Sequence, residues 1–344
     1  MEEACLSLKL KNVRLSSYEE VRENVLSIYS EPIALARKVK KKGMLKTLTK
    51  LDKVYHYVDD KVFKVCEYIP KPDELPLFYV EILSIAGITD YASLYGKLTG
   101  LRRTLRRLWK HYRLRVKLSL TVSEARKDLR EFIGRTLSIV RRIDDDLRRL
   151  NTALNELRRL PCIEFNQLKV VVAGMPQVGK STLVRTISSA KPEVSPFPFT
   201  TKNIILGHVS FNHFKFQIID TPGILDRPLD ELNDIERRAL TALKFLADVI
   251  VFMIDPRPSS YYPLNQQLDL LKSFLTMFKD KEMIVVINKI DEITTKHLED
   301  VLKEVNNVFK GRIFTISALH SINLNELVEY LRSKAYEYMK RTSA

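Results

Sequence analysis

A glycine-rich segment at residues 174–181 constrains the fold of this chain more than any other feature. The apolar run Leu168–Ala173 leads directly into Gly174-Met-Pro-Gln-Val-Gly179-Lys180-Ser181, which has the spacing G-x-x-x-x-G-K-S, and a helical pattern follows. A strand before this pattern and a helix after it are the context required for a phosphate-binding P-loop. Glycines let the backbone amides turn inward around phosphate oxygens, and the positive end of the helix points at the same charge. We therefore predict that Lys180 reaches the β- and γ-phosphates of a nucleotide and that Ser181 holds Mg²⁺.

Two further segments predict contacts to the phosphates and the metal. Asp220-Thr-Pro-Gly223 ends an apolar run, so its carboxylate can hold Mg²⁺ through water and the Gly223 amide can sense the γ-phosphate. Thr200-Thr201 lies between the P-loop helix and the next strand, where a hydroxyl can complete the metal shell. We predict Ser181, Thr201 and Asp220 as metal ligands and Lys180, Thr201 and Gly223 as the catalytic groups.

Two motifs near the end of the chain favour guanine over adenine. Asn288-Lys289-Ile290-Asp291 follows an apolar run, and the Asp291 carboxylate can accept hydrogen bonds from guanine N1–H and its exocyclic amine. Ser317-Ala318 follows the next run and places a backbone N–H at the guanine carbonyl. The sequence thus predicts GTP or GDP with Mg²⁺ as ligands. The predicted nucleotide-binding residues are Gly174, Gln177, Val178, Gly179, Lys180, Ser181, Thr182, Thr200, Thr201, Asp220, Gly223, Asn288, Lys289, Asp291, Ser317 and Ala318.

The two halves of the 344-residue chain follow different periods. From residue 165, short β-rich runs alternate with helical patterns, which indicates a mostly parallel sheet with helices on both faces. We predict six strands, with one antiparallel hairpin turning at Asn212-His213. The predicted strands are Leu168–Ala173, Ile204–Phe211, Phe214–Asp220, Asp248–Ile254, Met283–Ile287 and Arg312–Thr315.

Residues 1–164 read as an all-α bundle of about four antiparallel helices. Glu31-Pro32 predicts a helix start, since proline is tolerated in a first turn. Helices are also expected at 77–85 and from about Asp90 to about Lys117. Thr121-Val-Ser-Glu124 is a capping-box pattern, and apolar residues spaced three and four apart after it predict one helix as far as Pro161, about 55 Å long. We expect two domains, a helical one at 1–164 and a nucleotide-binding one at 165–344.

Charge is distributed unevenly between the halves. The whole chain carries +15, and counting residues gives 34 basic and 22 acidic side chains in 1–164, hence +12, against 23 basic and 20 acidic in 165–344, hence +3. A polyanionic partner, nucleic acid or an anionic membrane surface, is the physical expectation for the first half. The three cysteines, Cys5, Cys66 and Cys162, are isolated in sequence, so we expect neither a disulfide framework nor a zinc site and favour a reducing cytosol. The sequence has no long apolar run or lipidation signal, and we expect no membrane attachment and a cytoplasmic location.

One stretch concentrates the excess charge. Residues 101–118 hold eight cations without an acid, and Leu101, Leu105, Leu108 and Tyr112 are spaced to form a buried stripe. A solvated helix face is the ordinary explanation, but like charges repel unless an anion compensates them. We therefore favour a phosphate-backbone footprint, with a second cluster at Arg37, Lys38, Lys40, Lys41 and Lys42. The predicted RNA-binding residues are Arg102, Arg103, Arg106, Arg107, Lys110, Arg113, Arg115 and Lys117.

The motifs resemble those of a known group of GTPases. Pro198-Phe-Thr-Thr201 with Asp220-Thr-Pro-Gly-Ile224 resembles the Obg-like branch of the translation-factor class. The run from Asp220 to Leu229, then Asn233-Asp-Ile-Glu236 and Ala239-Leu-Thr-Ala-Leu243, is similar to the nucleolar GTP-binding (Nog-type) family, as is a basic helical domain before the G domain. The chain ends soon after the last helix of the G domain, which is typical of a compact archaeal-type member.

The resemblance implies a role in maturing the large ribosomal subunit, with the helical domain against rRNA. Its implied partners are a pre-ribosomal particle, ribosomal proteins or assembly factors, and we expect a monomer. Two alternatives are a GTP-dependent protein-interaction switch without direct RNA binding and a peripheral membrane GTPase that uses the cations on anionic lipid. The membrane alternative lacks a lipidation signal.

Two positions depart from related enzymes. Ile224 stands where Ras-type GTPases have a water-orienting glutamine, so we expect slow intrinsic hydrolysis, with Asp226 and Arg227 as nearby candidates for the missing group. Gln177 stands where several relatives have an asparagine that can support a catalytic potassium ion, which argues against stimulation by monovalent ions.

Overall fold

The computed structural model describes residues 5–11, 13–34, 42–211, 214–225 and 232–343. Within these residues the chain divides into two compact units. The helical unit comprises Leu8–Leu75 and Ala86–Arg158, and the α/β unit comprises Arg159–Ala344 with Pro76–Ile85 and Met1–Ser7. The predicted boundary after residue 164 differs from this division, because the α/β unit begins at Arg159 and includes a helix from the middle of the first half.

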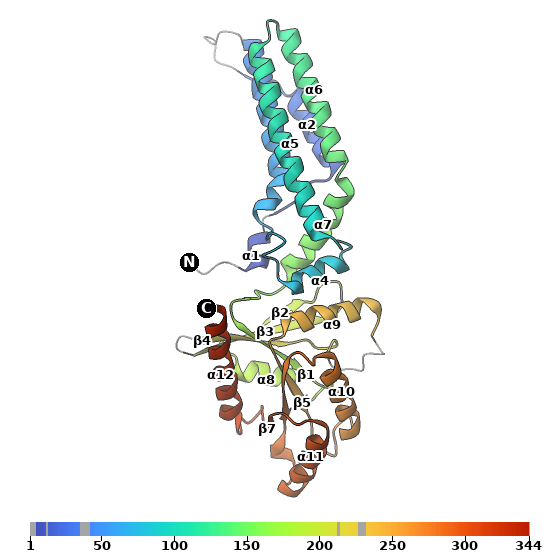
Figure 1. Cartoon of the computed structure of the whole chain (residues 1–344), viewed down its shortest axis with the longest axis vertical. Helices are drawn as coiled ribbons and strands as arrows, with labels where there is room; N and C mark the ends of the chain where they lie inside the picture. The colour runs from blue at the N-terminus through green and yellow to red at the C-terminus, as the bar shows by residue number, and fades with distance from the viewer. Residues whose placement is uncertain (1–4, 12, 35–41, 212–213, 226–231, 344) are drawn as a thin grey trace. The chain divides into compact units, whose positions relative to one another are not determined.

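Four long helices pack on one another in the helical unit (Figure 1), which is the predicted number, but the helix expected at 77–85 is not one of them. Phe63, Tyr112 and Phe132 are among its fully buried side chains. The four helices are α2 (Tyr18–Ser30), α3 (Lys42–Val58), α5 (Tyr91–Leu118) and α6 (Val122–Arg141). Shorter helical elements are α1 (Leu6–Leu10), the π-helical η1 (Asp59–Phe63), the 3₁₀ turn η2 (Lys64–Glu67) and α7 (Asp144–Arg159).

Local capping fixes the starts of the two longest helices described in the helical unit. The Asp90 side chain accepts a hydrogen bond of 2.9 Å from the Ser93 amide at the start of α5. The Thr121 hydroxyl accepts from the Glu124 amide, and the Glu124 carboxylate returns to the Thr121 amide, so the predicted capping box is confirmed. These caps satisfy amides that the first turn of a helix leaves without partners.

Two helix predictions were wrong. Glu31 has ψ 129° and ends α2, so Pro32 follows a helix instead of starting one, as prolines often do just after a C-terminus. The long helix after Thr121 is two helices, because Arg142 and Ile143 form a turn between α6 and α7. Three aspartates, Asp144–Asp146, occupy the first turn of α7, where negative charge favours a helix N-terminus. Asp144 also accepts a hydrogen bond of 2.8 Å from the Tyr18 amide, which fixes the break.

The described residues of the α/β unit form a seven-stranded sheet in the order β2-β3-β4-β1-β5-β6-β7. Strands β4, β1, β5, β6 and β7 run parallel, and β2-β3-β4 are antiparallel. Strands β1 and β5 are buried at every residue, as strands covered on both faces should be. The strands are β1 (Leu168–Ala173), β2 (Glu193–Pro196), β3 (Asn203–Phe211), β4 (Phe214–Asp220), β5 (Val249–Ile254), β6 (Glu282–Ile287) and β7 (Ile313–Thr315).

The prediction of six strands missed β2. This strand lies at the edge of the sheet and contains Pro196, and proline is confined to such edges because it cannot donate to a neighbour. The predicted hairpin is the pair β3-β4, although its turn at Asn212-His213 lies outside the described residues. The helices around the sheet are α8 (Lys180–Ile187), α9 (Asp234–Leu246), α10 (Leu264–Met277), α11 (Thr295–Val308) and α12 (Leu324–Ser343).

The helix α4 (Leu77–Ile85) belongs to the α/β unit although both of its flanks belong to the helical unit. It packs against α9, the helix that follows the Asp220–Gly223 motif (Figure 1). Its buried residues Phe78, Tyr79 and Ile82 explain why a strongly apolar helix ends up on this surface. Among the described residues, none of the helices combines the length and the apolar character needed to cross a membrane.

The cysteine prediction needs correction. Cys5 and Cys162 form a disulfide with Cα atoms 5.6 Å apart, and Cys66 is the free thiol. The partners are 157 residues apart in sequence, so their pairing depends on the fold and left no signal in the spacing. The argument from unpaired cysteines for a reducing compartment therefore loses its basis.

Candidate nucleotide-binding site

The predicted motifs gather at one edge of the sheet. Gly174 follows β1, Asp220 ends β4, Asn288 follows β6 and Ser317 lies just beyond β7. Because these strands are parallel, their carboxyl ends meet at one edge, which is where open α/β sheets bind ligands.

The backbone of residues 174–179 forms a cradle that admits no side chains at its two glycines. Gly174 has φ +134° and Gly179 has φ +104°, which residues with a Cβ rarely adopt. A Cβ on Gly174 would collide with the carbonyl of Met253, and one on Gly179 would collide with the amide of Asn288. Lys180 begins α8 and is 6% exposed, with its Nζ 2.8 Å from the Gly174 carbonyl and 2.9 Å from that of Met175. The lysine charge thus lies against the loop where a phosphate would bind.

A hydroxyl and a carboxylate face each other beside this cradle. The Ser181 hydroxyl donates a 2.6 Å hydrogen bond to Asp220, which is completely buried. Mg²⁺ prefers such oxygen ligands and keeps several waters, so this pair fits the predicted metal position. The Thr200 hydroxyl instead donates to the Phe197 carbonyl and accepts from the Lys202 amide within its own turn, and Thr201 is exposed. Ser181 and Asp220 are therefore brought together, while the two threonines lie in a separate turn.

The segment after Asp220 lies against the cradle through backbone contacts. The Gly174 amide donates to the carbonyl of Leu225 at 3.1 Å. Gly223 has φ +81°, and a Cβ there would meet the Lys202 side chain at 2.7 Å, so Lys202 packs directly on this glycine. Ile224 is 1% exposed, so its side chain belongs to the core. Asp226 and Arg227 lie outside the described residues.

The base-recognition motifs are linked to the cradle by side chains of Asn288 and Lys289. The Asn288 side chain donates a hydrogen bond of 2.8 Å to the Val178 carbonyl and accepts one of 2.8 Å from the Ala318 amide. These two bonds connect three loops. Lys289 donates 2.7 Å to the carbonyl of Gln177, which itself has φ +66° and an exposed side chain. These bonds place the predicted guanine-binding residues around one end of the P-loop.

The surroundings of the Asp291 carboxyl group favour its ionised form. A hydrogen bond from the Ser317 side chain is the main cause that lowers the pKa of the Asp291 carboxyl below its ordinary value. His320 Nε2 lies 3.5 Å from the same carboxylate. An ionised carboxylate can accept from both donors of guanine.

Sequence reasoning missed a supporting carboxylate, Asp255, which directly follows β5. Its carboxylate accepts a hydrogen bond of 2.7 Å from Lys289 and further hydrogen bonds from the Arg257 guanidinium. Its backbone amide and carbonyl are both hydrogen-bonded to the Gln267 side chain. Burial alone raises the pKa of Asp255, but hydrogen bonds from Arg257 and Lys289 outweigh it and the pKa is lowered. Its position at a strand end was the signal that could have found it.

The eight predicted RNA-binding cations of α5 divide into two sets. Arg102 pairs with Asp59 and Glu67, Arg113 with Asp52, and Arg115 with Asp128 and Glu131. The assumption that this charge is unrelieved was therefore wrong for these three, because acids on other elements compensate it. The remaining five are exposed and form no ion pair within the described part of the chain: Arg103, Arg106, Arg107, Lys110 and Lys117.

Two other predictions about this surface have partial answers. In the predicted buried stripe, Leu105 and Tyr112 are buried, whereas Leu101 and Leu108 are half-buried. In the second basic cluster, Lys42 is the first residue of α3, and Arg37, Lys38, Lys40 and Lys41 lie outside the described residues.

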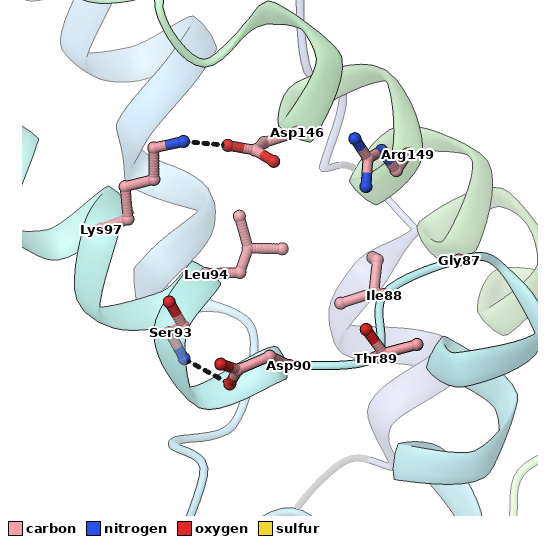
Figure 2. A pocket seen from close by; sticks show the side chains of 9 residues that line it. All are labelled: Gly87, Ile88, Thr89, Asp90, Ser93, Leu94, Lys97, Asp146 and Arg149. Atoms are coloured by element: carbon pink, nitrogen blue, oxygen red, sulfur yellow. Dashed lines mark hydrogen bonds and ion pairs between the residues drawn. The ribbon is translucent and has the colours of Figure 1, made fainter.

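A cavity of about 210 Å³ lies at the start of α5 (Figure 2). Lys97 is already paired with Asp146, and the Asp90 carboxylate caps the helix through Ser93. Lys97, Asp146 and Asp90 therefore have partners, and Arg149 is the remaining charged side chain of the lining.

This fold and site define a P-loop GTPase domain that binds GTP or GDP with Mg²⁺. A family profile described as 50S ribosome-binding GTPase matches residues 169–289, and one described as NOG1 N-terminal helical domain matches residues 26–164. The chain belongs to the nucleolar GTP-binding (Nog-type) family.

The relatives differ in length. An uncharacterized protein of Methanocaldococcus jannaschii is 37% identical over 70% of this chain and 68% of its own length. Nucleolar GTP-binding protein 1 of Drosophila melanogaster is 32% identical over 70% of this chain but only 37% of its own length. A crystal structure of nucleolar GTP-binding protein 1 from Plasmodium falciparum aligns with 29% identity and a TM-score of 0.43, covering 54% of this chain and 92% of that one.

Proposed function

We propose that this protein is a GTP-hydrolysing switch that acts in the assembly of the large ribosomal subunit. The observation that carries the proposal is the site at the sheet edge, where the cradle, the Ser181–Asp220 pair and the Asn288 bridge meet. The matching profile is that of a 50S ribosome-binding GTPase, which supports the ribosomal large subunit as the setting.

We assign the parts of the site as follows. In this assignment the amides of the cradle and the Lys180 amine hold the phosphates, and the Gly223 amide senses the γ-phosphate. Ser181, Asp220 and, after rearrangement of its turn, Thr201 hold the metal. Bound Mg²⁺ supplies charge stabilisation to the phosphates. Asp291 and the Ala318 amide read the guanine, while Asn288 and Lys289 fix the loops that carry them.

We propose that the isolated protein hydrolyses GTP slowly. The attacking water needs a hydrogen-bonding group to align it, and the buried alkyl side chain of Ile224 offers none. A catalytic group supplied by a partner is worth on the order of 10³–10⁵ in rate in GTPases. Single-turnover hydrolysis should therefore be slow alone and accelerate with the cognate particle, and fast turnover by the protein alone would contradict this assignment.

We further propose that the exposed cations of α5 anchor the helical unit to rRNA. Five of the predicted cations are exposed and form no ion pair among the described residues. At 0.7–0.9 log units of affinity per contact and per log unit of salt, the slope should be no steeper than about 3.5–4.5. A steeper slope would require phosphate contacts elsewhere on the chain. The triple variant Arg103→Glu, Arg107→Glu, Lys110→Glu should lose RNA binding and keep GTP affinity.

The alternative, a switch whose bundle binds proteins, is favoured by one observation. Three of the eight α5 cations are paired internally, which lowers the charge left for RNA. Both alternatives assume that the protein acts on ribosomal particles. We would test this by sedimenting the tagged protein with ribosomal particles, with and without a non-hydrolysable GTP analogue. RNA binding by the purified chain then separates the alternatives, since the protein-interaction switch predicts none.

A further inference from the structure

A second cavity of the helical unit combines aromatic and cationic walls. It measures about 600 Å³ and lies between α3, η2 and α5. Cavities of roughly 300–1,000 Å³ are the size that encloses small organic ligands. Its aromatic lining is Tyr55, His56, Tyr95 and Trp109.

The aromatic wall is preorganised. The Tyr55 and Trp109 rings are stacked with centroids 4.4 Å apart and planes 13° from parallel. The indole N–H donates a hydrogen bond of 2.7 Å to Asp52, which does not line the cavity. The Arg113 guanidinium lies 5.5 Å from the centroid of the Trp109 ring, so the part of the indole that lines the cavity is flanked by Tyr55 and by a cation. The His56 ring lies 5.1 Å from that of Tyr55, and its side chain is exposed. Such rings are the surfaces on which unpaired nucleobases stack.

The charged groups that line the cavity are three arginines and two acids, which leaves a net charge of +1, and both acids are paired with Arg102. Asp59 accepts two hydrogen bonds from Arg102, at 2.7 and 2.9 Å, and Glu67 lies 2.7 Å from the same guanidinium. Burial raises the pKa of the Cys66 thiol to about 11, so this group stays neutral. Arg103 and Arg106 line the cavity, are exposed, and pair with no acid among the residues described. Two guanidinium groups are therefore left to face an anion.

We propose that this cavity binds one unpaired nucleotide of single-stranded RNA, with the base against the aromatic wall and its flanking phosphates on Arg103 and Arg106. The proposal rests on RNA binding by the helical unit and adds a preference for single strands. A peptide fits less well, since the uncompensated groups are cations beside rings. Arg107 and Lys110 continue the positive surface along the same helix, where the neighbouring phosphates of the strand would lie.

The chain carries its own reporter for this site, because Trp109 is its single tryptophan. Titrating the full-length protein with a short single-stranded oligouridine or oligoadenosine should quench the tryptophan fluorescence. An RNA duplex of equal length should bind the cations without quenching. Equal quenching by duplex, or binding of the single strand without any change in fluorescence, would overturn the proposal while leaving RNA anchoring intact.

Two matched variants separate the cavity from the general basic face. Arg106 and Arg107 are neighbours, and both are exposed, but Arg107 does not line the cavity. Arg106→Ala should weaken single-strand binding by about 10-fold, as expected for a charged hydrogen bond, and duplex binding much less. Arg107→Ala should weaken both to the same extent. If both variants leave the ratio of single-strand to duplex affinity unchanged, the cavity has no role.

A third variant tests the aromatic wall itself. Trp109→Ala should weaken single-strand binding by roughly 5- to 100-fold, the range found for removal of one stacking ring, when RNA binding is followed by anisotropy of labelled RNA. Circular dichroism reports whether the helices remain folded, and Arg106→Ala provides the test if they do not. Failure of every RNA to bind at low salt would refute the RNA-anchoring proposal and this one together.

Discussion

Replacing Arg102 should destabilise the helical unit although sequence alone places this residue on an RNA-binding face. Its guanidinium makes two hydrogen bonds to Asp59 and lies 2.7 Å from Glu67. The Arg102 and Asp59 side chains are 26% and 18% exposed, whereas Glu67 is 51% exposed. Hydrogen bonds to charged groups contribute ~1.5–3 kcal/mol and exposed pairs ~0–1 kcal/mol. Discounting for solvent, we expect Arg102→Ala to cost about 2 kcal/mol.

Urea unfolding of the full chain, followed by Trp109 fluorescence, measures this cost within the helical unit. With a urea slope of ~2 kcal/mol per molar, the midpoint should fall by about 1 M. Arg107→Ala is the control, because this exposed side chain has no ion pair among the described residues and its loss should change stability by less than ~0.5 kcal/mol. Equal midpoints for the two variants would refute the division of the α5 cations into internal and free sets.

Three further outcomes are expected. Gly179→Ala should abolish binding of fluorescent GDP, because φ +104° and contact with Asn288 exclude a Cβ, whereas Gly96→Ala on α5, with open space around it, should bind normally. Cys5→Ser should lower the stability of the α/β unit by at most ~5 kcal/mol, the entropy of closing the loop between the two cysteines. Wild-type protein denatured without reductant should show one reactive thiol, and three reactive thiols would contradict the disulfide. Ser317→Ala should raise the pKa of Asp291, because it removes the hydrogen bond that lowers this pKa. GTP affinity is present above the Asp291 pKa and lost as the pH falls through it, so the variant should lose affinity at a higher pH than the wild type. Identical plots of GTP affinity against pH for the two proteins would show that Ser317 does not stabilise the Asp291 carboxylate.

The meeting of the predicted motifs at one edge of the sheet could be foreseen because they follow strand ends. A parallel sheet brings the carboxyl ends of its strands together, so motifs far apart in sequence meet without further information. Ser181 and Asp220 meet in this way, as do Asn288 and Ala318. Asp255 follows the same rule, and was missed because its partners Arg257 and Gln267 form no recognised motif.

The helical half was less predictable because periodicity does not show where a helix pauses. The apolar spacing continues through Ile143, which is buried in the turn between α6 and α7, so the break left the pattern unchanged. Pro32 was ambiguous for a related reason, since proline is common both in a first turn and just after a last one. The disulfide depends on contact between residues 157 positions apart, which local patterns do not encode.

The two surfaces of this protein are built in different ways, and this decides how each responds to substitution. The nucleotide site is built largely from backbone groups whose positions are set by Gly174, Gly179 and the Asn288 bridge, so it is sensitive to added atoms as much as to lost charges. The basic face of α5 is what remains after the acids of neighbouring elements have neutralised part of it. A substitution at Asp59 or Asp52 would therefore release a cation and increase the charge offered to a polyanion. The surface charge of the helix is set by its partners as much as by its own sequence, which is why a count of lysines and arginines along α5 overstates the number of phosphates that it can contact.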